Sequence, residues 1–187
     1  MRNTVLHKVT QTVLAILLSA AAAGAATCTW NGSVDNDWSN AGNWDTKPSS
    51  SADNVLLTCD GNAPTNQDIA ALSINILYIT NDVEGFSFGV SGLPITLNDI
   101  QLLEPSSGYS TSAINCDVVI AANSGWYLRS RHRLIINGNI SETGGSRYIA
   151  GNGGGWLFLN GTNTHTGGFK NNQSTIFFQN TNSMGTV

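Results

Sequence analysis

Three arginines that alternate with other residues are the most distinctive chemical group in this sequence. Arg129, Arg131 and Arg133 are separated by Ser130 and His132. Side chains alternate between the two faces of a strand, so a strand here would place the three guanidinium groups on one face. Because a guanidinium can bind a carboxylate through two parallel hydrogen bonds, the row predicts a site for an acidic polysaccharide or for the carboxylates of a partner. The alternative is a solvated outer face that discourages strand pairing.

Three tryptophans in a polar, turn-forming segment are the second such group. Trp30, Trp38 and Trp44 carry about 150 to 250 Å² of surface each, so each needs either burial or a ligand. Burial would make residues 27–54 a cap over the open end of a repetitive fold. Exposure would let the rings stack on sugars and form a carbohydrate-binding face.

The acidic residues and histidines give no recognisable metal or catalytic pattern. Asp35, Asp37 and Asp45 miss the spacing of a calcium loop, and the sequence has no Cys-x-x-Cys, phosphate loop or His-Glu-x-x-His. Beyond the tryptophan segment the carboxylates are scattered, and His165 is expected to pack in place of an aromatic residue. We therefore predict no metal, no cofactor and no enzyme, with a polysaccharide lyase or hydrolase as the alternative.

Short apolar runs recur along the chain after residue 54, and the arginine row lies among them. Such runs, too brief for helices and bounded by Asn, Ser and Gly corners, are typical of strands and turns. A period of about 20 residues fits one turn of a parallel β-helix, which predicts an all-β solenoid over residues 55–187. A β-sandwich is the alternative fold. The anchor residues expected to face inward are Val55, Ile74, Ile95, Val118, Ile136, Leu157 and Ile176.

The composition agrees with a turn-rich β protein and argues against a nucleic-acid partner. Only 11% of the 187 residues are charged, against about 25% in an average protein. Without Arg2 and Lys8, six basic residues face twelve acidic ones, a net charge of −6. An acidic chain of this kind is not attracted to phosphate backbones.

Residues 1–26 have the pattern of a cleavable secretory signal. Arg2 and Lys8 precede an apolar run from Val13, and small residues lead up to Thr27. The run is shorter than the roughly 20 residues that a spanning helix needs. We therefore predict a secreted or cell-surface protein with no membrane span after cleavage.

Export would place three cysteines in an oxidising compartment, where one disulfide and one free thiol are expected. Cys28 and Cys59 both lie near turns in the N-terminal third, whereas Cys116 belongs to an apolar alternation. We predict a Cys28–Cys59 bridge. The alternative is that all three are small buried hydrophobic residues.

The C-terminal stretch carries a resemblance to a known repeat. Residues 157–168 read Leu-Phe-Leu-Asn-Gly-Thr-Asn-Thr-His-Thr-Gly-Gly, followed by a strand pair, an Asn-rich end and Gly185. Residues 155–187 resemble the autotransporter-associated β-strand repeat of bacterial exported and surface proteins, with His165 where that repeat usually has an aromatic residue. The tryptophan segment resembles the start of many proteins that contain it. The resemblance implies a right-handed parallel β-helix and a non-catalytic stalk or display surface.

These observations predict an exported structural β-solenoid, the N-terminal part of a larger passenger-type protein that serves adhesion, display or secretion. Its expected partners are extracellular polysaccharides or cell-surface components. The alternatives are a carbohydrate-binding module, which would use the tryptophans or the arginine row, and a polysaccharide-degrading enzyme.

Overall fold

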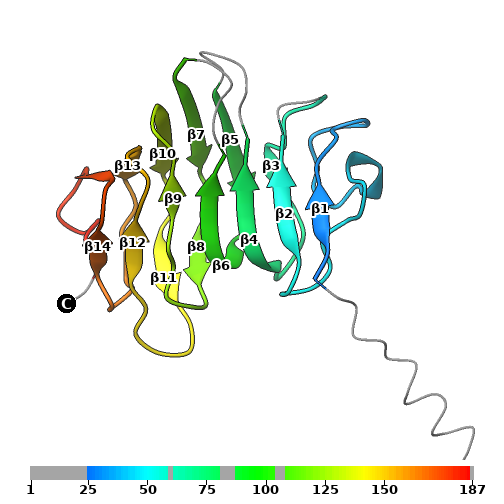
Figure 1. Ribbon diagram of the computed structural model, residues 1–187. Coiled ribbons are helices and arrows are strands. Elements are labelled where there is room, and N and C mark those ends of the chain that lie inside the picture. Colours follow the sequence, from blue (N-terminus) through cyan, green and yellow to red (C-terminus); the bar gives the residue numbers. More distant parts are fainter. Residues whose placement is uncertain (1–24, 59–60, 81–86, 104–107, 186–187) are drawn as a thin grey trace, which may run out of the picture.

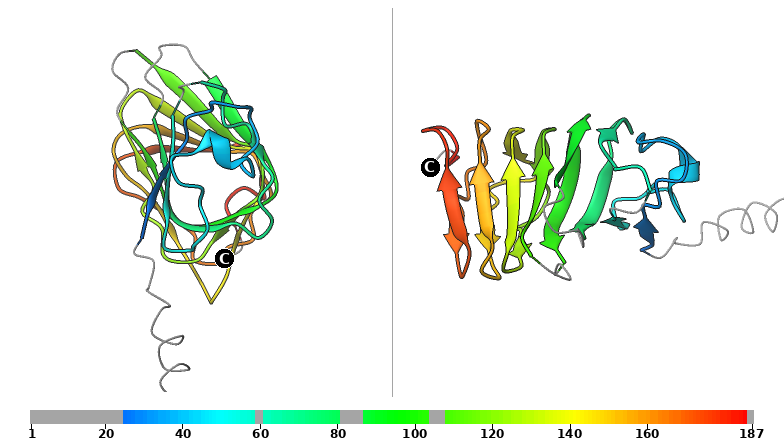
Figure 2. Two further views of the ribbon diagram at one scale, coloured as in Figure 1. Left: turned by 90° about the vertical axis from the view of Figure 1, so that its right-hand side faces the viewer. Right: turned by 90° about the horizontal axis from the view of Figure 1, so that it is seen from above.

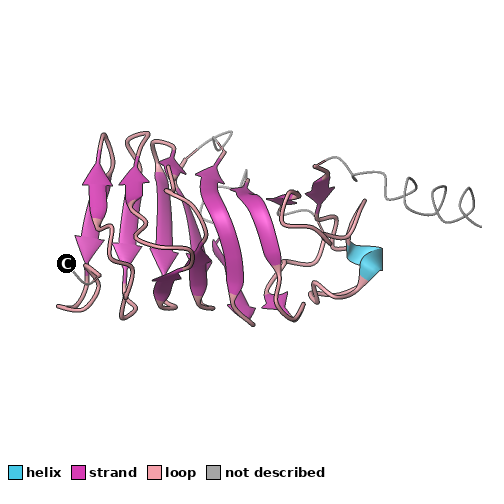
Figure 3. Ribbon diagram, turned by 90° about the horizontal axis from the view of Figure 1, so that it is seen from below, coloured by secondary structure: helices cyan, strands magenta, loops and turns pink. Residues whose placement is uncertain are grey.

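The chain winds into a parallel β-solenoid of about six turns, as the computed structural model shows (Figure 1). The structure describes residues 25–58, 61–80, 87–103 and 108–185. Seen along its axis, the stacked coils overlay as one outline around a common interior (Figure 2, left). A single short 3₁₀ helix, η1 (Ala41–Asn43), lies at the N-terminal end, and strands make up the regular structure of the other described coils (Figure 3).

Two long sheets form the walls, because each coil contributes a strand to both. The first sheet runs β1 (Thr27–Thr29), β2 (Asn54–Leu57), β4 (Ser73–Ile79), β6 (Ile95–Leu102), β8 (Val118–Ile120) and β11 (Ile140–Glu142), with β9 (Tyr127–Leu128) also paired to β6. The second runs β3 (Asn66–Gln67), β5 (Ser87–Gly92), β7 (Ser110–Ile114), β10 (His132–Ile136), β13 (Trp156–Leu159) and β15 (Thr175–Phe178). Every pairing between these described strands is parallel, so the predicted β-helix is confirmed and the sandwich alternative is wrong.

A third, narrower wall opens where the long strands bend. The in-out alternation of β4 and β6 slips by one residue at Asn75 and at Asn98, so each strand turns a corner while staying paired. The first half of β6 pairs with β8, and the second half pairs with β9. The third wall is completed by β12 (Ile149–Gly151) and β14 (Phe169–Asn171), which pair with each other.

Most coils are longer than the sequence period predicted. Val55 lies opposite Leu77, and Leu134 lies opposite Leu157, so these paired residues are 22 and 23 positions apart, whereas Leu157 and Ile176 pair at 19. The predicted anchors are buried, except for the partly buried Ile176, but the series crosses from one wall to the other between Val118 and Ile136. This crossing, and steps between anchors that are not register partners, lowered the apparent period to about 20.

The interior is a column of aliphatic side chains. In β10, Leu134 and Ile136 are fully buried while Arg133 is exposed, as alternation along a strand requires. Leu77, Ile100 and Leu128 fill the same column in other coils. Complete burial of one such side chain contributes about 1.5 to 3 kcal/mol, so stacking of coils supplies most of the stability.

Asparagine ladders fix the corners between the walls. Asn137 donates to the Asn115 side chain at 2.6 Å, and Asn160 donates to Asn137 at 2.6 Å, each one coil further along. No side chain fits at the next residue, because a Cβ on Gly138 would lie 2.0 Å from the Cys116 carbonyl oxygen in the previous coil. The Asn and Gly corners that the sequence suggested therefore have a steric basis and a hydrogen-bonding basis.

Candidate functional site

The arginine row does not lie on one strand. Arg129 forms an isolated antiparallel bridge with Gly154, residues 130–131 form a turn, and β10 begins only at His132. Arg131 adopts a left-handed backbone conformation with φ of 70°. The prediction of three guanidinium groups on one strand face is therefore wrong, because this turn interrupts the strand. All three arginine side chains are nevertheless exposed.

Strand register brings Arg133 beside a pair of stacked aromatic residues. Arg133 lies opposite Trp156 in the neighbouring coil, and its guanidinium carbon is 5.1 Å from the centre of the Trp156 ring. The Tyr109 ring stacks on Trp156 with 5.7 Å between ring centroids and 9° between planes. Tyr109 is 58% exposed, while Trp156 is partly exposed. We call the outer surface formed by Tyr109, Arg131, Arg133 and Trp156 the Arg–Trp face.

Two more cations lie on aromatic rings in the same coils. Arg129 sits 5.0 Å from the Tyr127 ring centre, and the Lys170 ammonium lies 3.6 Å from that of Tyr148. Such contacts contribute about 0.5 to 1 kcal/mol each at exposed sites. They also hold long basic side chains in defined positions on the surface.

The charge of the chain is strongly divided along the solenoid axis. Residues 27–117 contain one Lys and eleven acidic residues, a net charge of −10. Residues 118–187 contain five Lys or Arg and one Glu, a net charge of +4. The −6 total of the chain after residue 26 therefore hides a basic C-terminal part.

The three tryptophans of the cap are buried, with 1%, 0% and 5% of the Trp30, Trp38 and Trp44 surfaces exposed. Trp44 meets the other two rings edge to face, with centroids 4.9 and 5.5 Å apart. Each indole N–H donates to a backbone carbonyl, Trp38 for example to Pro64. This arrangement fits the cap interpretation. The idea that these three rings stack on sugars is wrong for this structure, since none presents an open face.

The aspartates of the cap organise turns. The Asp35 carboxylate accepts hydrogen bonds from the Asp37 N–H and from the Asn40 and Asn43 side chains. The backbone hydrogen bond from Asp37, with those from Asn40 and Asn43, lowers the pKa of Asp35. No group of three metal-binding side chains gathers anywhere in the described residues.

The two described cysteines lie in similar settings. Cys28 is a fully buried free thiol whose pKa rises to about 11 because of burial, reinforced by Asp53 and Asp45. Cys116 is also buried and free, and burial again raises its pKa to about 11. Cys59 lies outside the described residues, but because Cys28 is free, the predicted Cys28–Cys59 bridge is not formed in this structure.

A buried pair that sequence reasoning missed lies inside the solenoid. The Ser110 hydroxyl and His132 Nδ1 are 2.6 Å apart, and both residues are 2% exposed or less. A Ser–His contact is the usual start of a nucleophilic site. Here the aliphatic column encloses it, so we interpret it as an internal polar pair. The sequence feature that could have indicated this pair is its separation of 22 residues, which is the length of one coil.

His165 is buried as well, and it meets the Phe169 ring edge to face at 4.7 Å between ring centroids. This confirms the expectation that it packs like an aromatic residue. Burial lowers the pKa of His165, although the negative charge of Glu142 acts in the opposite direction. The lowered pKa favours the neutral ring.

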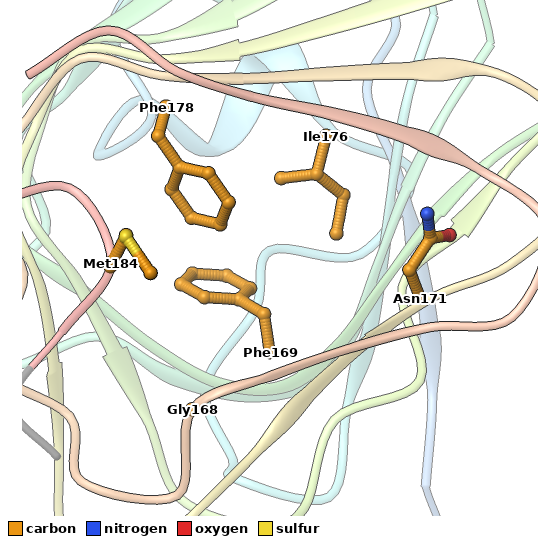
Figure 4. Close-up of a pocket in the computed structure, with 6 residues that line it drawn as sticks. All are labelled: Gly168, Phe169, Asn171, Ile176, Phe178 and Met184. Atoms are coloured by element: carbon orange, nitrogen blue, oxygen red, sulfur yellow. The ribbon is translucent and has the colours of Figure 1, made fainter.

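An apolar cavity of about 340 Å³ lies at the C-terminal end of the solenoid. Phe169, Phe178 and Met184 point toward one another across it, with Ile176 and Asn171 beside them (Figure 4). Phe178 and Met184 are 38% and 53% exposed. The two ends of the solenoid therefore differ, since tryptophans close one and apolar side chains remain open at the other.

Comparison with known protein families, with characterised proteins and with solved structures found no match to this chain. The resemblance of residues 155–187 to the autotransporter-associated repeat therefore stays a hypothesis. No helix among the described residues is long and apolar enough to span a membrane.

Proposed function

We propose that this chain is an exported structural β-solenoid that serves adhesion or display outside the cell. The observation that carries the proposal is the stacked parallel fold itself, closed at the N-terminal end by the tryptophan cap. Such a fold offers long, regular outer walls, and each wall keeps its geometry because every coil is hydrogen bonded to the next.

Three further features support the proposal. Residues 1–26 have the charge and hydrophobicity pattern of a secretory signal. Residues 155–185, the described part of the repeat-like stretch, continue the coils, and buried Asn163 accepts from the Ile140 N–H and donates to the Ser183 carbonyl. The motif's asparagine thus joins one coil to the next. A role as part of a larger passenger-type protein follows from the same resemblance.

Export is tested by expressing the full sequence in a bacterial host and determining where the protein accumulates and at which residue it begins. We expect a processed chain outside the cytoplasm that begins at or next to Thr27. The matched control replaces one apolar residue of the signal by a charge, Leu17→Arg, which should retain the unprocessed chain inside. An unprocessed chain in the cytoplasm in both cases would contradict the proposal.

Catalysis is tested separately. Incubation of the purified chain with pectic and alginate polymers, followed by assays for reducing ends and for unsaturated uronates, is expected to show no turnover. Turnover that follows the purified protein would instead support the enzyme alternative.

A further inference from the structure

The Arg–Trp face combines features that ordinary solvated surface lacks. The pairing of β7 with β10 places Thr111 beside Arg133, while Arg133 lies opposite Trp156. Neighbouring strands are about 4.8 Å apart, so Tyr109, Arg133 and Trp156 lie within three strand widths. Arg131 lies in the turn just before β10, where its carbonyl accepts a hydrogen bond from the Ser110 N–H, next to Tyr109. Three of its four residues, Arg131, Arg133 and Trp156, belong to the basic part of the chain.

The two guanidinium groups have free hydrogen-bonding capacity. In the part of the chain that the structure describes, neither Arg131 nor Arg133 has an acidic partner or a side-chain hydrogen bond. Two other exposed cations differ: Arg147 donates to the Thr143 and Gly144 carbonyls, and Lys47 donates to the Ser39 carbonyl. Each guanidinium presents five N–H donors in a fork that matches a carboxylate.

The aromatic pair supplies a flat apolar surface next to these donors. Tyr109 lies parallel to Trp156 and leaves more than half of its own surface exposed. The C–H faces of a sugar ring stack on such a surface, and aromatic rings with a few polar groups are typical of ligand sites. A polymer with both sugar rings and carboxylates would satisfy both halves of the face.

We propose that the Arg–Trp face binds an acidic polysaccharide, with its carboxylates on Arg131 and Arg133 and a sugar ring on Tyr109. The strand spacing is close to the length of one pyranose unit, so a chain that runs along the solenoid axis would meet successive coils in register. Single-stranded nucleic acid is the competing polyanion, and the titration below separates the two. The inference rests on the proposed extracellular role, which gives the protein access to such polymers.

The test is calorimetric titration of the purified chain with polygalacturonate oligomers at low ionic strength. Neutral dextran and single-stranded DNA serve as comparison ligands. We expect binding of polygalacturonate alone, weakened by added salt because exposed charges are screened. Absence of polygalacturonate binding, or equally tight binding of dextran or DNA, would overturn the proposal.

Variants locate the site. Arg131→Gly suits the backbone conformation, and Arg133→Gln keeps hydrogen-bonding capacity without charge. Together they should weaken binding at least about tenfold. The matched control is the double variant Arg147→Gln with Lys170→Gln, which removes the same charge from the same coils and should change affinity less than about twofold. Equal losses in both would reduce the effect to net charge and overturn the proposal. Tyr109→Ala, at an exposed position, tests the aromatic half without disturbing the core.

The export experiment stands apart from this titration. A processed, exported chain that does not bind polygalacturonate would contradict the proposed binding site but not the proposed function. A chain that binds polygalacturonate but stays in the cytoplasm would contradict the proposed function but not the binding site.

Discussion

The N-terminal cap and the C-terminal coils use the same residue types in opposite ways. In the cap, Trp30, Trp38 and Trp44 are buried, and their N–H groups are bonded to backbone carbonyls. In the C-terminal coils, Trp156 lies on the outer wall between a tyrosine and an arginine. The cap lies in the acidic part of the chain and Trp156 in the basic part. Residue type alone therefore does not identify a binding residue; position relative to the solenoid wall does.

The largest expected contrast lies between the two kinds of tryptophan. Trp38→Ala should lower the free energy of unfolding by about 3 to 5 kcal/mol, because it empties a fully buried site. Trp156→Ala should lower it by only about 1 kcal/mol, because it removes surface stacking and one cation–π contact. Urea denaturation followed by circular dichroism measures both. Equal losses of unfolding free energy in the two variants would contradict the distinction between buried cap tryptophans and the exposed wall tryptophan.

The open C-terminal end should make the protein associate. Phe177 and Phe178 are each 38% exposed on β15, which pairs only with β13 among the described strands. Exposed apolar strand edges template pairing with other chains. Sedimentation velocity should show concentration-dependent oligomers that Phe177→Lys with Phe178→Lys converts to monomer.

The matched control for this association lies at the opposite end. Val34→Lys, at an exposed cap residue, should leave the oligomers unchanged. Monomers at all concentrations in the unaltered protein would contradict the prediction.

Asparagine ladders in the N-terminal and C-terminal coils should contribute different amounts to the free energy of unfolding. Asn75 donates to Asn54 and accepts from Asn98 in a partly buried setting, so Asn75→Ala should lower stability by about 1 to 3 kcal/mol. Asn137 has the same two bonds in an exposed setting, and its loss should amount to about 0.5 to 1.5 kcal/mol. Thermal denaturation of both variants tests the order, and a larger loss at Asn137 would reverse it.

Acid should weaken the cap through Asp53. Burial tends to raise the pKa of this carboxyl group, but hydrogen bonds from the Ser49, Ala26 and Ser50 N–H groups lower it overall. A depressed folded pKa stabilises the fold above the unfolded value of about 3.9, and this contribution is lost as the pH falls through the folded value. The Tm of Asp53→Asn should therefore fall less between pH 6 and pH 3 than the Tm of the unaltered protein, by a modest amount. An unchanged drop would contradict the assignment.

Periodicity and turn residues were enough to predict the solenoid, the cap and the inward positions of residues such as Val55 and Leu157. The coil length was too short for most coils, in part because Ile136 and Val118 look alike in a sequence although they line different walls. The turn at Arg131 was missed because its one turn-forming residue, Ser130, also fits the alternating strand pattern. The stacking of Tyr109 on Trp156 joins residues 47 positions apart, and only the register of three strands reveals it.

Intrinsic fluorescence tests most directly whether the C-terminal wall, and not the cap, meets the ligand. Polygalacturonate should change the tryptophan emission of the unaltered protein and of Trp44→Phe, and it should leave the emission of Trp156→Phe unchanged. This result is expected because Trp156 lies under the proposed site, whereas Trp44 is buried in the cap. A change that persists in Trp156→Phe and disappears in Trp44→Phe would place binding at the cap and contradict the account.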